Sequence, residues 1–348
     1  MLEFSHFLML LSIVIPVYNE IDALPKLLPT LQQTLSANNQ DYELIFVDDG
    51  SKDGSVKFLK EVAQDPRVKV VLFSRNFGHQ AAITAGIDFA SGDGVVVMDA
   101  DLQDPPELLP EMVRLLEQGY DVVSAQRVSR SGESVIKKLT ATMFYWVIQK
   151  MVDKRVQPEV GDFRMFSRRA ISAIRRLREQ HRFMRGMVAW LGLREVIVPF
   201  HRNARVAGET KYPMWKMIRF ACTAISSFSA LPLRMSIFWG FFVTAFGAGY
   251  AIYTIFATYV LKVTVPGWTS LVCLNIIFSG TTMIAIGLVG EYVAQIYEES
   301  KGRPLYVVSE SVNFRDQSEI DRSIVLAGHP GIGLAPTEEA SPRESLRR

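Results

Sequence analysis

The sequence predicts an α/β protein with a mostly parallel sheet, followed by amphipathic interface helices and a C-terminal hairpin of two membrane-spanning helices. Three observations lead to this fold class. Short apolar runs alternate with helical patterns in the N-terminal third, polar clusters follow the ends of those runs, and two long segments of the last third carry almost no charge. Strands that alternate with helices are typical of βαβ units, in which helices cover both faces of a parallel sheet.

The first strands and helices follow one another in regular order. Runs rich in apolar or β-branched residues are expected to be strands at residues 13–15, 43–47, 68–73 and 95–98. Leucines recur at helical spacing from Ala23 to Leu35, and a second helix is expected from Gln80 to Ala90. The apolar residues 1–11 lack the basic region of a secretory signal and lead directly into the first strand, so we expect no cleaved signal.

Polar or acidic residues follow three of the expected strands. The clusters are Tyr18-Asn19-Glu20, Asp48-Asp49-Gly50-Ser51 and Asp99-Ala100-Asp101. Open parallel sheets bind ligands beyond the carboxyl ends of their strands, so we expect these clusters to converge on one site. The adjacent acids of the second cluster could accept hydrogen bonds from a base N–H and a ribose hydroxyl. A turn with a helix N-cap is the alternative for this stretch.

The carboxylates of Asp99 and Asp101 stand one residue apart at the end of a buried strand, where they suit a divalent cation. Hard carboxylate oxygens match Mg²⁺ or Mn²⁺, and the phosphates of a nucleotide complete the octahedron. Gln103 offers a further neutral oxygen in the same loop. This stretch therefore predicts a site for a metal ion and a diphosphate.

The last third of the chain predicts a membrane hairpin. Met235–Leu261 and Trp268–Tyr297 are long segments with almost no charge. Even the shorter would be about 40 Å long as a helix, which exceeds the hydrocarbon core of about 30 Å. Basic residues lie mainly outside this hairpin, at Arg219, Arg234, Lys301 and Arg303. The positive-inside rule then places both ends in the cytoplasm. A pair of core helices in a soluble protein is the alternative.

The remaining segments bear on the membrane and on partners. Residues 143–152 and 213–228 mix aromatic and basic side chains, as interfacial helices do, although the first could equally be a core helix with a basic face. The chain becomes polar after Asn313, which predicts a mobile tail. A net charge of +2 gives no support for nucleic-acid binding. The two cysteines, Cys222 and Cys273, have neither metal-ligand spacing nor a disulfide framework.

Three stretches carry a resemblance to a known family. They are residues 15–20 (Ile-Pro-Val-Tyr-Asn-Glu), 47–51 (Val-Asp-Asp-Gly-Ser) and 98–106, which begins Met-Asp-Ala-Asp-Leu-Gln-Asp. Together they resemble the family 2 glycosyltransferases of GT-A (Rossmann-like) fold. Within that family, the chain is most similar to the polyprenyl-phosphate glycosyltransferases, which include the Gtr-type undecaprenyl-phosphate glucosyltransferases and dolichyl-phosphate mannose synthase. The resemblance covers residues from about 11 to 310.

The resemblance implies a set of site residues. Nucleotide-sugar contacts are implied for Pro16, Tyr18, Glu20, Val47, Asp48, Asp49, Asp99, Ala100 and Asp101. It also implies that Asp99, Asp101 and Gln103 hold Mg²⁺ or Mn²⁺. Catalytic roles are implied for Asp101, Arg127, Asp162, Arg205 and Lys211.

Several of these roles leave alternatives open. Arg127 matches an arginine of the donor or acceptor phosphate site. Arg205 and Lys211 would stabilise phosphates, and anchoring at the membrane interface is their alternative. Asp162, in a Gly-Asp-Phe-Arg stretch, either orients the cation cluster or the sugar, or forms a buried ion pair with Arg164 or Arg127. His79 could lie near the donor, but we expect it to cap a helix.

The resemblance implies inverting, metal-dependent transfer of a hexose to polyprenyl (undecaprenyl) phosphate at the cytoplasmic face of the inner membrane. We expect glucose from UDP-glucose, and UDP-linked aminoarabinose, galactose and N-acetylhexosamine are the alternatives. The acceptor phosphate is already ionised, so the reaction needs in-line positioning and stabilisation of the leaving diphosphate rather than a general base. The alternatives are a processive polysaccharide synthase, whose Gln-x-x-Arg-Trp motif is absent from residues 180–185, and a non-catalytic scaffold or flippase subunit.

These expectations divide the chain into four parts. Residues 1–212 would form a cytoplasmic catalytic domain, 213–232 an amphipathic juxtamembrane helix, 233–298 two transmembrane helices, and 299–348 a cytoplasmic C-terminal segment with its tail. The expected partners are the nucleotide sugar, the polyprenyl phosphate, the lipid bilayer and a second copy of the chain. Small and polar residues at 279–282 could pack against that second copy.

Overall fold

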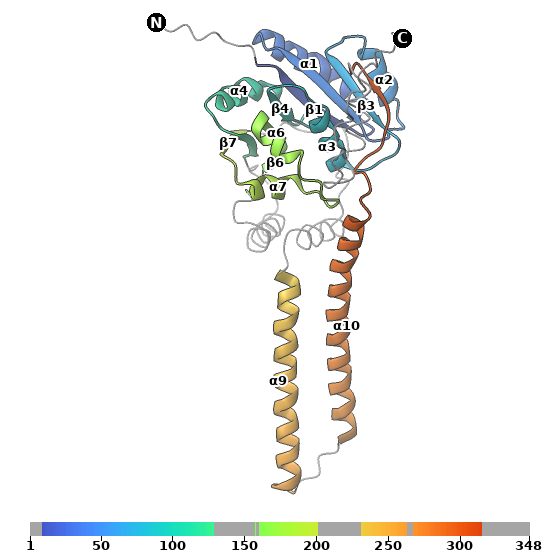
Figure 1. Ribbon diagram of the computed structural model, residues 1–348, viewed down its shortest axis with the longest axis vertical. Helices are drawn as coiled ribbons and strands as arrows, with labels where there is room; N and C mark the ends of the chain where they lie inside the picture. The colour runs from blue at the N-terminus through green and yellow to red at the C-terminus, as the bar shows by residue number, and fades with distance from the viewer. Residues whose placement is uncertain (1–8, 129–156, 158–159, 201–230, 263–266, 315–348) are drawn as a thin grey trace, which may run out of the picture.

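The computed structural model describes residues 9–128, 157, 160–200, 231–262 and 267–314. It consists of a globular α/β part from which two long helices extend side by side (Figure 1). Both segments expected to be interfacial helices, 143–152 and 213–228, lie outside the described residues.

One mixed sheet forms the centre of the globular part, with the strand order β7-β5-β6-β4-β1-β2-β3-β8. The strands are β1 (Leu11–Val17), β2 (Tyr42–Asp48), β3 (Val68–Phe73), β4 (Gly94–Val97), β5 (Val122–Arg127), β6 (Val160–Ser167), β7 (Glu195–Phe200) and β8 (Val308–Val312). Strands β1 to β4 run parallel to one another, whereas β6 pairs antiparallel with both β4 and β5. The four strands expected from the sequence are β1 to β4, and the α/β prediction is confirmed.

Helices cover both faces of the sheet. They are α1 (Leu24–Ala37), α2 (Ser55–Val62), α3 (His79–Phe89), α4 (Leu109–Glu117), α6 (Arg168–Ile174) and α7 (Met184–Leu191), with a 3₁₀ turn, η1, at Pro106–Leu108. Every residue of β1 and β2 is buried, which explains why these strands read as continuous apolar runs. Leu24, Leu27 and Leu31 of α1 pack in one hydrophobic cluster, and α3 packs in a second cluster with Val14 of β1.

The strand β8 closes one edge of the sheet and was not expected. It pairs antiparallel with β3, although it follows the two long helices in the sequence. Asn313 fixes its end, because its side-chain amide donates hydrogen bonds to the carbonyl oxygens of Ala63 and Val68. Tyr306, just before β8, is fully buried and stacks on Phe73 with a centroid distance of 5.2 Å. The chain after the hairpin is therefore part of the globular core.

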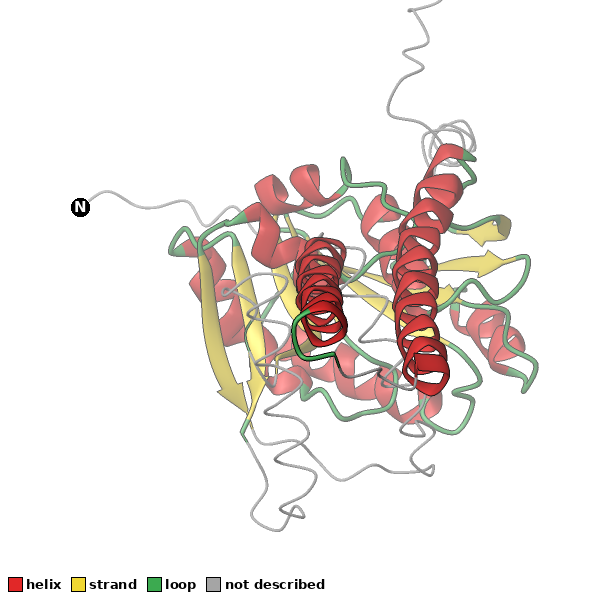
Figure 2. Cartoon of the chain, turned by 90° about the horizontal axis from the view of Figure 1, so that it is seen from below, coloured by secondary structure: helices red, strands yellow, loops and turns green. Residues whose placement is uncertain are grey.

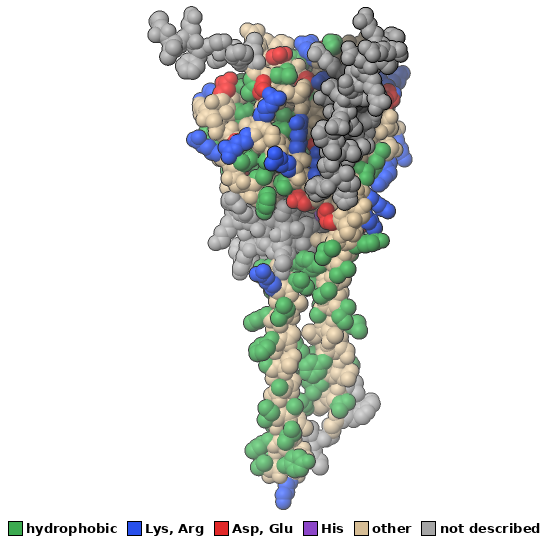
Figure 3. Space-filling view, in the orientation of Figure 1, with side chains coloured by type: hydrophobic (Ala, Val, Ile, Leu, Met, Phe, Trp, Pro, Cys, Tyr) green, Lys and Arg blue, Asp and Glu red, His purple; other side chains and the backbone are tan. Residues whose placement is uncertain are grey.

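The two long helices, α9 (Leu231–Tyr259) and α10 (Gly267–Ser300), are long and apolar enough to cross a membrane. Figure 3 shows hydrophobic side chains along them and charged side chains on the globular part. Seen from below, the helices lie beside each other under the sheet (Figure 2). A Cβ atom at Gly247 of α9 would lie 2.5 Å from Cζ of Phe278 in α10, so the helices touch there. The expected hairpin is thus present as a pair of adjacent helices.

Candidate functional site

The carboxyl ends of β1, β2 and β4 lie at one edge of the sheet, because these strands are parallel and adjacent. The antiparallel strand β6 begins at this edge, and β5 ends there. Residues that follow β1, β2, β4 and β5 therefore meet residues that open β6. Pro16 and Val47 are buried within their strands, whereas Tyr18 is 48% exposed just beyond β1.

Hydrogen bonds join the loops after β1 and β2 into one rim. The backbone N–H of Asn19 donates to Oγ of Ser51 (2.9 Å), and Oδ1 of Asn19 accepts from the N–H of Lys52 (2.8 Å). The backbone N–H of Glu20 donates to Oγ of Ser55 (3.1 Å). Asn19 has a φ of 55°, a left-handed conformation that Asn tolerates better than most residues. The polar cluster after β1 is therefore held in place by the cluster after β2.

The two adjacent acids at the end of β2 have different surroundings. Oδ1 of Asp48 accepts from the N–H groups of Gly50 (3.1 Å) and Ser51 (3.0 Å), whereas its Oδ2 is buried and has no hydrogen-bond partner among the described residues. Asp49 accepts through both oxygens, from the N–H groups of Phe77 (2.6 Å) and Gly78 (2.9 Å). Burial raises the pKa of Asp49 despite these two bonds. Asp49 thus ties the end of β2 to the loop between β3 and α3.

This loop runs directly over Gly50. A Cβ atom there would lie 2.9 Å from the backbone of Arg75 and Asn76, and Gly50 has a φ of +76°. Both the close approach and the left-handed backbone require glycine at this position.

The loop after β4 carries the Asp-Ala-Asp pair. The N–H of Asp99 donates to Oδ2 of Asp104 (3.0 Å), and Oδ1 of Asp101 accepts from the N–H of Gln103 (3.1 Å). Leu102, with a φ of 61°, turns the backbone between them, and Ala100 is buried below. Gln103 and Asp104 are buried, and neither Oε1 of Gln103 nor Oδ1 of Asp104 has a hydrogen-bond partner among the described residues.

Electrostatics in this loop favour a cation. Burial raises the pKa of Asp99, and the charges of Asp162 and Asp101 raise it further, against His79 and Arg127. Burial and the charge of Asp99 raise the pKa of Asp104 to about 7. Carboxylates that repel one another in a low dielectric gain from a positive charge between them.

The residues present fit a divalent metal that shares its shell with a ligand. Asp99 and Asp101 offer carboxylate oxygens, and the unpartnered Oε1 of Gln103 is a neutral oxygen in the same loop. Within the described ranges, no group of three or more His, Cys, Asp or Glu residues forms a complete metal site. Octahedral Mg²⁺ or Mn²⁺ would therefore need further oxygens, which phosphates or water can supply.

His79, the first residue of α3, joins the Asp-Ala-Asp loop to β6. Its Nε2 lies 3.6 Å from Oδ1 of Asp99 and 3.4 Å from Oδ2 of Asp162. Burial alone would lower the pKa of His79, but Asp162 and Asp99 outweigh it and raise the pKa above its usual value. The expectation that His79 caps a helix is wrong, because α3 has no side-chain cap and the imidazole instead contacts these two carboxylates.

Three side chains of the described residues contact Asp162. Besides His79, its oxygens lie 3.4 Å from Nε of Arg185 and 3.2 Å from Nε2 of Gln80, which donates to Oδ2. Burial alone would raise the pKa of Asp162, but His79 and the charge of Arg185 hold it well below the usual range. Arg164 is buried on the same strand, where its Nη1 lies 3.8 Å from Oε1 of Glu195. Among the described residues, the arginine that contacts Asp162 is thus Arg185 rather than Arg164 or Arg127.

Arg127 ends β5 at the same edge. Its charge lowers the pKa of Asp99 and of Asp104, and its Nε is buried with no hydrogen-bond partner among the described residues. A Cβ atom at Gly161 would lie 3.4 Å from Nη2 of Arg127, so the guanidinium also lies against the start of β6.

The structure therefore brings together most of the side chains predicted from the sequence. Asp48, Asp49, Asp99, Asp101, Arg127 and Asp162 lie at one sheet edge, while Arg205 and Lys211 lie outside the described residues. Sequence reasoning missed Gln80 and Arg185, which both contact Asp162. No local pattern marks them, because each lies in the first turn of a helix, Gln80 in α3 and Arg185 in α7, and its partner Asp162 lies on a distant strand.

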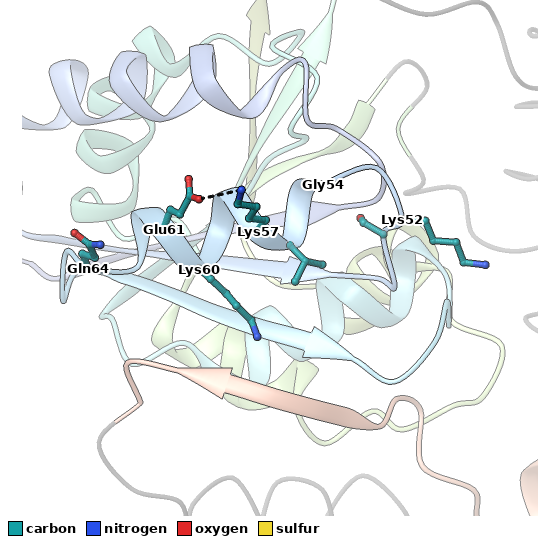
Figure 4. A pocket seen from close by; sticks show the side chains of 8 residues that line it. Lys52, Gly54, Lys57, Lys60, Glu61 and Gln64 are labelled. Atoms are coloured by element: carbon teal, nitrogen blue, oxygen red, sulfur yellow. Dashed lines mark ion pairs between the residues drawn. The ribbon is translucent and has the colours of Figure 1, made fainter.

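A hollow on the outer side of α2 is separate from this cluster (Figure 4). Its lining residues include Lys52, Lys57 and Glu61, and none of them is a predicted site residue. Lys57 and Glu61 form an exposed ion pair at 4.0 Å across one helical turn. Such a pair contributes little to stability, and we assign no function to this hollow.

The comparisons with known proteins agree on one family. The model of "Glycosyl transferase family 2" matches residues 12–175. The uncharacterized glycosyltransferase YkcC of Bacillus subtilis is 43% identical over 88% of this chain and 95% of its own length. The uncharacterized glycosyltransferase sll0501 of Synechocystis is 46% identical over 86% of this chain and 95% of its own. The SfII prophage-derived bactoprenol glucosyl transferase of Shigella flexneri is 38% identical over 87% of this chain and 98% of its own length.

Proposed function

Because this chain belongs to glycosyltransferase family 2, we propose that it transfers one hexose from a nucleotide diphosphate sugar to a polyprenyl phosphate at a membrane surface. It is an enzyme of GT-A fold, with a mixed sheet covered by helices. One observation carries the proposal most directly. The Asp-Ala-Asp loop after β4 meets Asp162 of β6 through His79, on a domain joined to two apolar helices.

The donor would bind across the carboxyl ends of β1, β2 and β4. The rim residues Pro16, Tyr18, Glu20, Val47, Asp48 and Asp49 would hold the nucleotide, and Asp99, Ala100 and Asp101 would lie at its diphosphate. Asp99, Asp101 and Gln103 would hold Mg²⁺ or Mn²⁺, which supplies positive charge to a leaving diphosphate. UDP-glucose is the donor we propose, since relatives of this chain from Shigella flexneri and from the Shigella phage SfV are named bactoprenol glucosyl transferases.

The chain's own residues would orient the acceptor. A phosphate oxygen forms a bond to the anomeric carbon while the bond between that carbon and the diphosphate oxygen breaks, so displacement inverts the configuration. The acceptor oxygen is already anionic, and no residue has to remove a proton from it. Arg127, with Arg205 and Lys211, would supply positive charge to the phosphates, while Asp162 holds His79 and Arg185 in place.

The membrane arrangement is part of the proposal. Residues 1–212 would form the catalytic domain, 213–232 an interfacial helix, 233–298 the two spans, and 299–348 a C-terminal segment whose strand β8 returns to the sheet. Catalytic domain and termini would be cytoplasmic at the inner membrane, because basic residues flank the hairpin. A homo-oligomer would cover the exposed apolar and small residues of α10.

Membranes that contain the protein, incubated with labelled nucleotide sugars and undecaprenyl phosphate, test the proposal. We expect one labelled hexose on the lipid, with UDP-glucose as the best donor. A polymeric product would instead support a polysaccharide synthase. If none of the nucleotide sugars labels the lipid, the proposal is overturned and a scaffold or flippase subunit is favoured.

A further inference from the structure

A cavity of about 460 Å³ lies where the globular part meets the base of α10. Three segments distant in sequence line it: the loop between β3 and α3, residues 180–183 before α7, and residues 303–305 after α10. It is separate from the hollow on α2 and adjoins the site described above, because it is lined by His79, Gln80 and by Phe77 and Gly78, whose N–H groups Asp49 accepts.

The lining of this cavity is cationic. Arg75, Arg182 and Arg303 each come from a different segment, and no acidic residue is among the described residues that line it. His181 also lines the cavity, but its Nε2 lies 3.0 Å from Oε2 of Glu298, which offsets any charge on its imidazole. The three arginines therefore leave an excess of positive charge facing one cavity.

Arg182 is buried, and one of its N–H donors has no hydrogen-bond partner among the described residues. It is 9% exposed, its Nη1 donates to the carbonyl oxygen of Leu177, and its Nε is buried with no hydrogen-bond partner among the described residues. Burial lowers the pKa of Arg182 and the charges of Asp88 and Glu179 both raise it, but Asp88 is already bound by Arg178 (2.7 and 3.0 Å) and by the hydroxyl of Tyr306 (2.9 Å). A buried guanidinium with an unmatched donor is costly unless an anion joins it.

The other two arginines lie on the open side of the cavity. Arg75 and Arg303 are both exposed, and the guanidinium of Arg75 lies 4.1 Å from the ring centroid of Phe77. Arginine side chains bind phosphate through paired, charge-assisted hydrogen bonds, which makes a phosphate group the ligand chemistry that fits this lining.

The cavity links the apolar hairpin to the candidate transfer site. At one end, α10 finishes at Ser300, and Gln180 donates to Oε1 of Glu299 (2.7 Å) and to the carbonyl oxygen of Arg303 (2.6 Å). At the other end, His79 and Gln80 contact Asp162 directly. A phosphate carried by a lipid that emerges beside α10 would meet these arginines before it reached Asp162.

We propose that this arginine-lined cavity binds the phosphate of the polyprenyl phosphate acceptor as it passes from the bilayer to the transfer site. The inference rests on the proposed function for the identity of the acceptor. It assigns acceptor affinity to Arg75, Arg182 and Arg303, none of which was among the predicted site residues.

Binding of farnesyl phosphate to the full-length protein in detergent, without any donor, tests the inference. Arg75→Gln and Arg303→Gln are suitable variants, because both side chains are exposed and neither change should unfold the protein. Lys301→Gln is the matched control, since Lys301 is exposed two residues from Arg303 but lies over the ring of Tyr297 (4.0 Å) rather than in the cavity.

We expect each glutamine variant to raise the Kd for farnesyl phosphate and the KM for the acceptor about 10-fold, because each loses one charge-assisted hydrogen bond to the phosphate. Lys301→Gln should keep the parent values, and Arg303→Lys should recover part of the affinity. An unchanged acceptor Kd in both glutamine variants would overturn the inference.

Vesicles of phosphatidylglycerol test whether another anionic lipid can supply the phosphate group. If the two variants weaken phosphatidylglycerol binding as much as farnesyl phosphate binding, the cavity is a general anionic-lipid site and the acceptor assignment is wrong. The binding assay is independent of catalysis. Arginine-dependent binding without sugar transfer would therefore refute the proposed function alone, and transfer with unchanged acceptor KM in the variants would refute this inference alone.

Discussion

The neighbouring acids Asp48 and Asp49 provide a stringent test of the site, because the same substitution should have different effects at the two positions. In Asp49→Asn, only one of the two oxygens remains to accept from the N–H groups of Phe77 and Gly78, and the new amide donor faces the other. In Asp48→Asn, Oδ1 can still accept from both Gly50 and Ser51.

The structure sets the size of each effect. Asp49→Asn loses one hydrogen bond to a charged acceptor, which is worth about 1.5–3 kcal/mol. For a domain of this size that corresponds to a fall in Tm of about 3–12 °C. Asp48→Asn keeps its backbone bonds, and the oxygen it replaces has no partner among the described residues, so its Tm should change by less than about 2 °C.

Thermal unfolding followed by intrinsic fluorescence, together with the KM for the donor, measures both effects in the full-length protein. Asp48→Asn should raise the KM for the donor about 10-fold, because the variant loses one charge-assisted hydrogen bond to the donor. Equal Tm values for the two variants would refute the role of Asp49 in holding the loop that carries His79. An unchanged donor KM in Asp48→Asn would remove Asp48 from the donor site.

Three further predictions concern the site and its support. Asp162→Asn places an amide donor against His79 and should lower kcat for transfer about 100-fold, with an unchanged kcat as the contrary result. Burial alone would raise the pKa of Glu43, but bonds from Lys69 and two serines hold it below 4.5. The charged form of Glu43 therefore stabilises the fold above about pH 4.5. In urea titrations, Glu43→Gln should lower the unfolding free energy by about 2–4 kcal/mol at pH 7. This difference should shrink as the pH falls below 4.5. Gly86→Ala would place Cβ 2.1 Å from Cγ1 of Val14 and should cost about 1–3 kcal/mol by the same titration; an unchanged midpoint would contradict this packing.

The parallel part of the fold could be predicted because its signals are local. Strands β1 to β4 are buried on both faces, so their residues form short apolar runs, and polar residues follow where the strands end. Since the carboxyl ends of adjacent parallel strands share an edge, the sequence alone predicts that Asp48 and Asp99 lie in one region. The long apolar helices α9 and α10 have a local signal too, because each contains a long run of residues with almost no charge.

The antiparallel and long-range parts had no comparable signal. Asp162 reaches the site because β6 runs opposite to β4, so its first residues, not its last, lie at the site edge. The short strand β8 contains Ser309, Glu310 and Ser311 among its five residues, and it forms a strand by pairing with β3 across more than 200 residues of sequence. The contact of His79 with two carboxylates has no local signal either, because Asp99 and Asp162 come from other elements.

The most direct test of the central claim is mass spectrometry of the lipid made from UDP-glucose and undecaprenyl phosphate, with the parent protein and with Asp101→Ala in parallel membranes. Equal amounts of both proteins should be found in the membrane fraction. We predict undecaprenyl phosphate that carries one hexose from the parent protein and a loss of at least about 100-fold in the variant, since Asp101 would hold the charge at the diphosphate. Equal product from both proteins would contradict the assigned site, and no lipid-linked hexose from the parent protein with any nucleotide sugar would contradict the function.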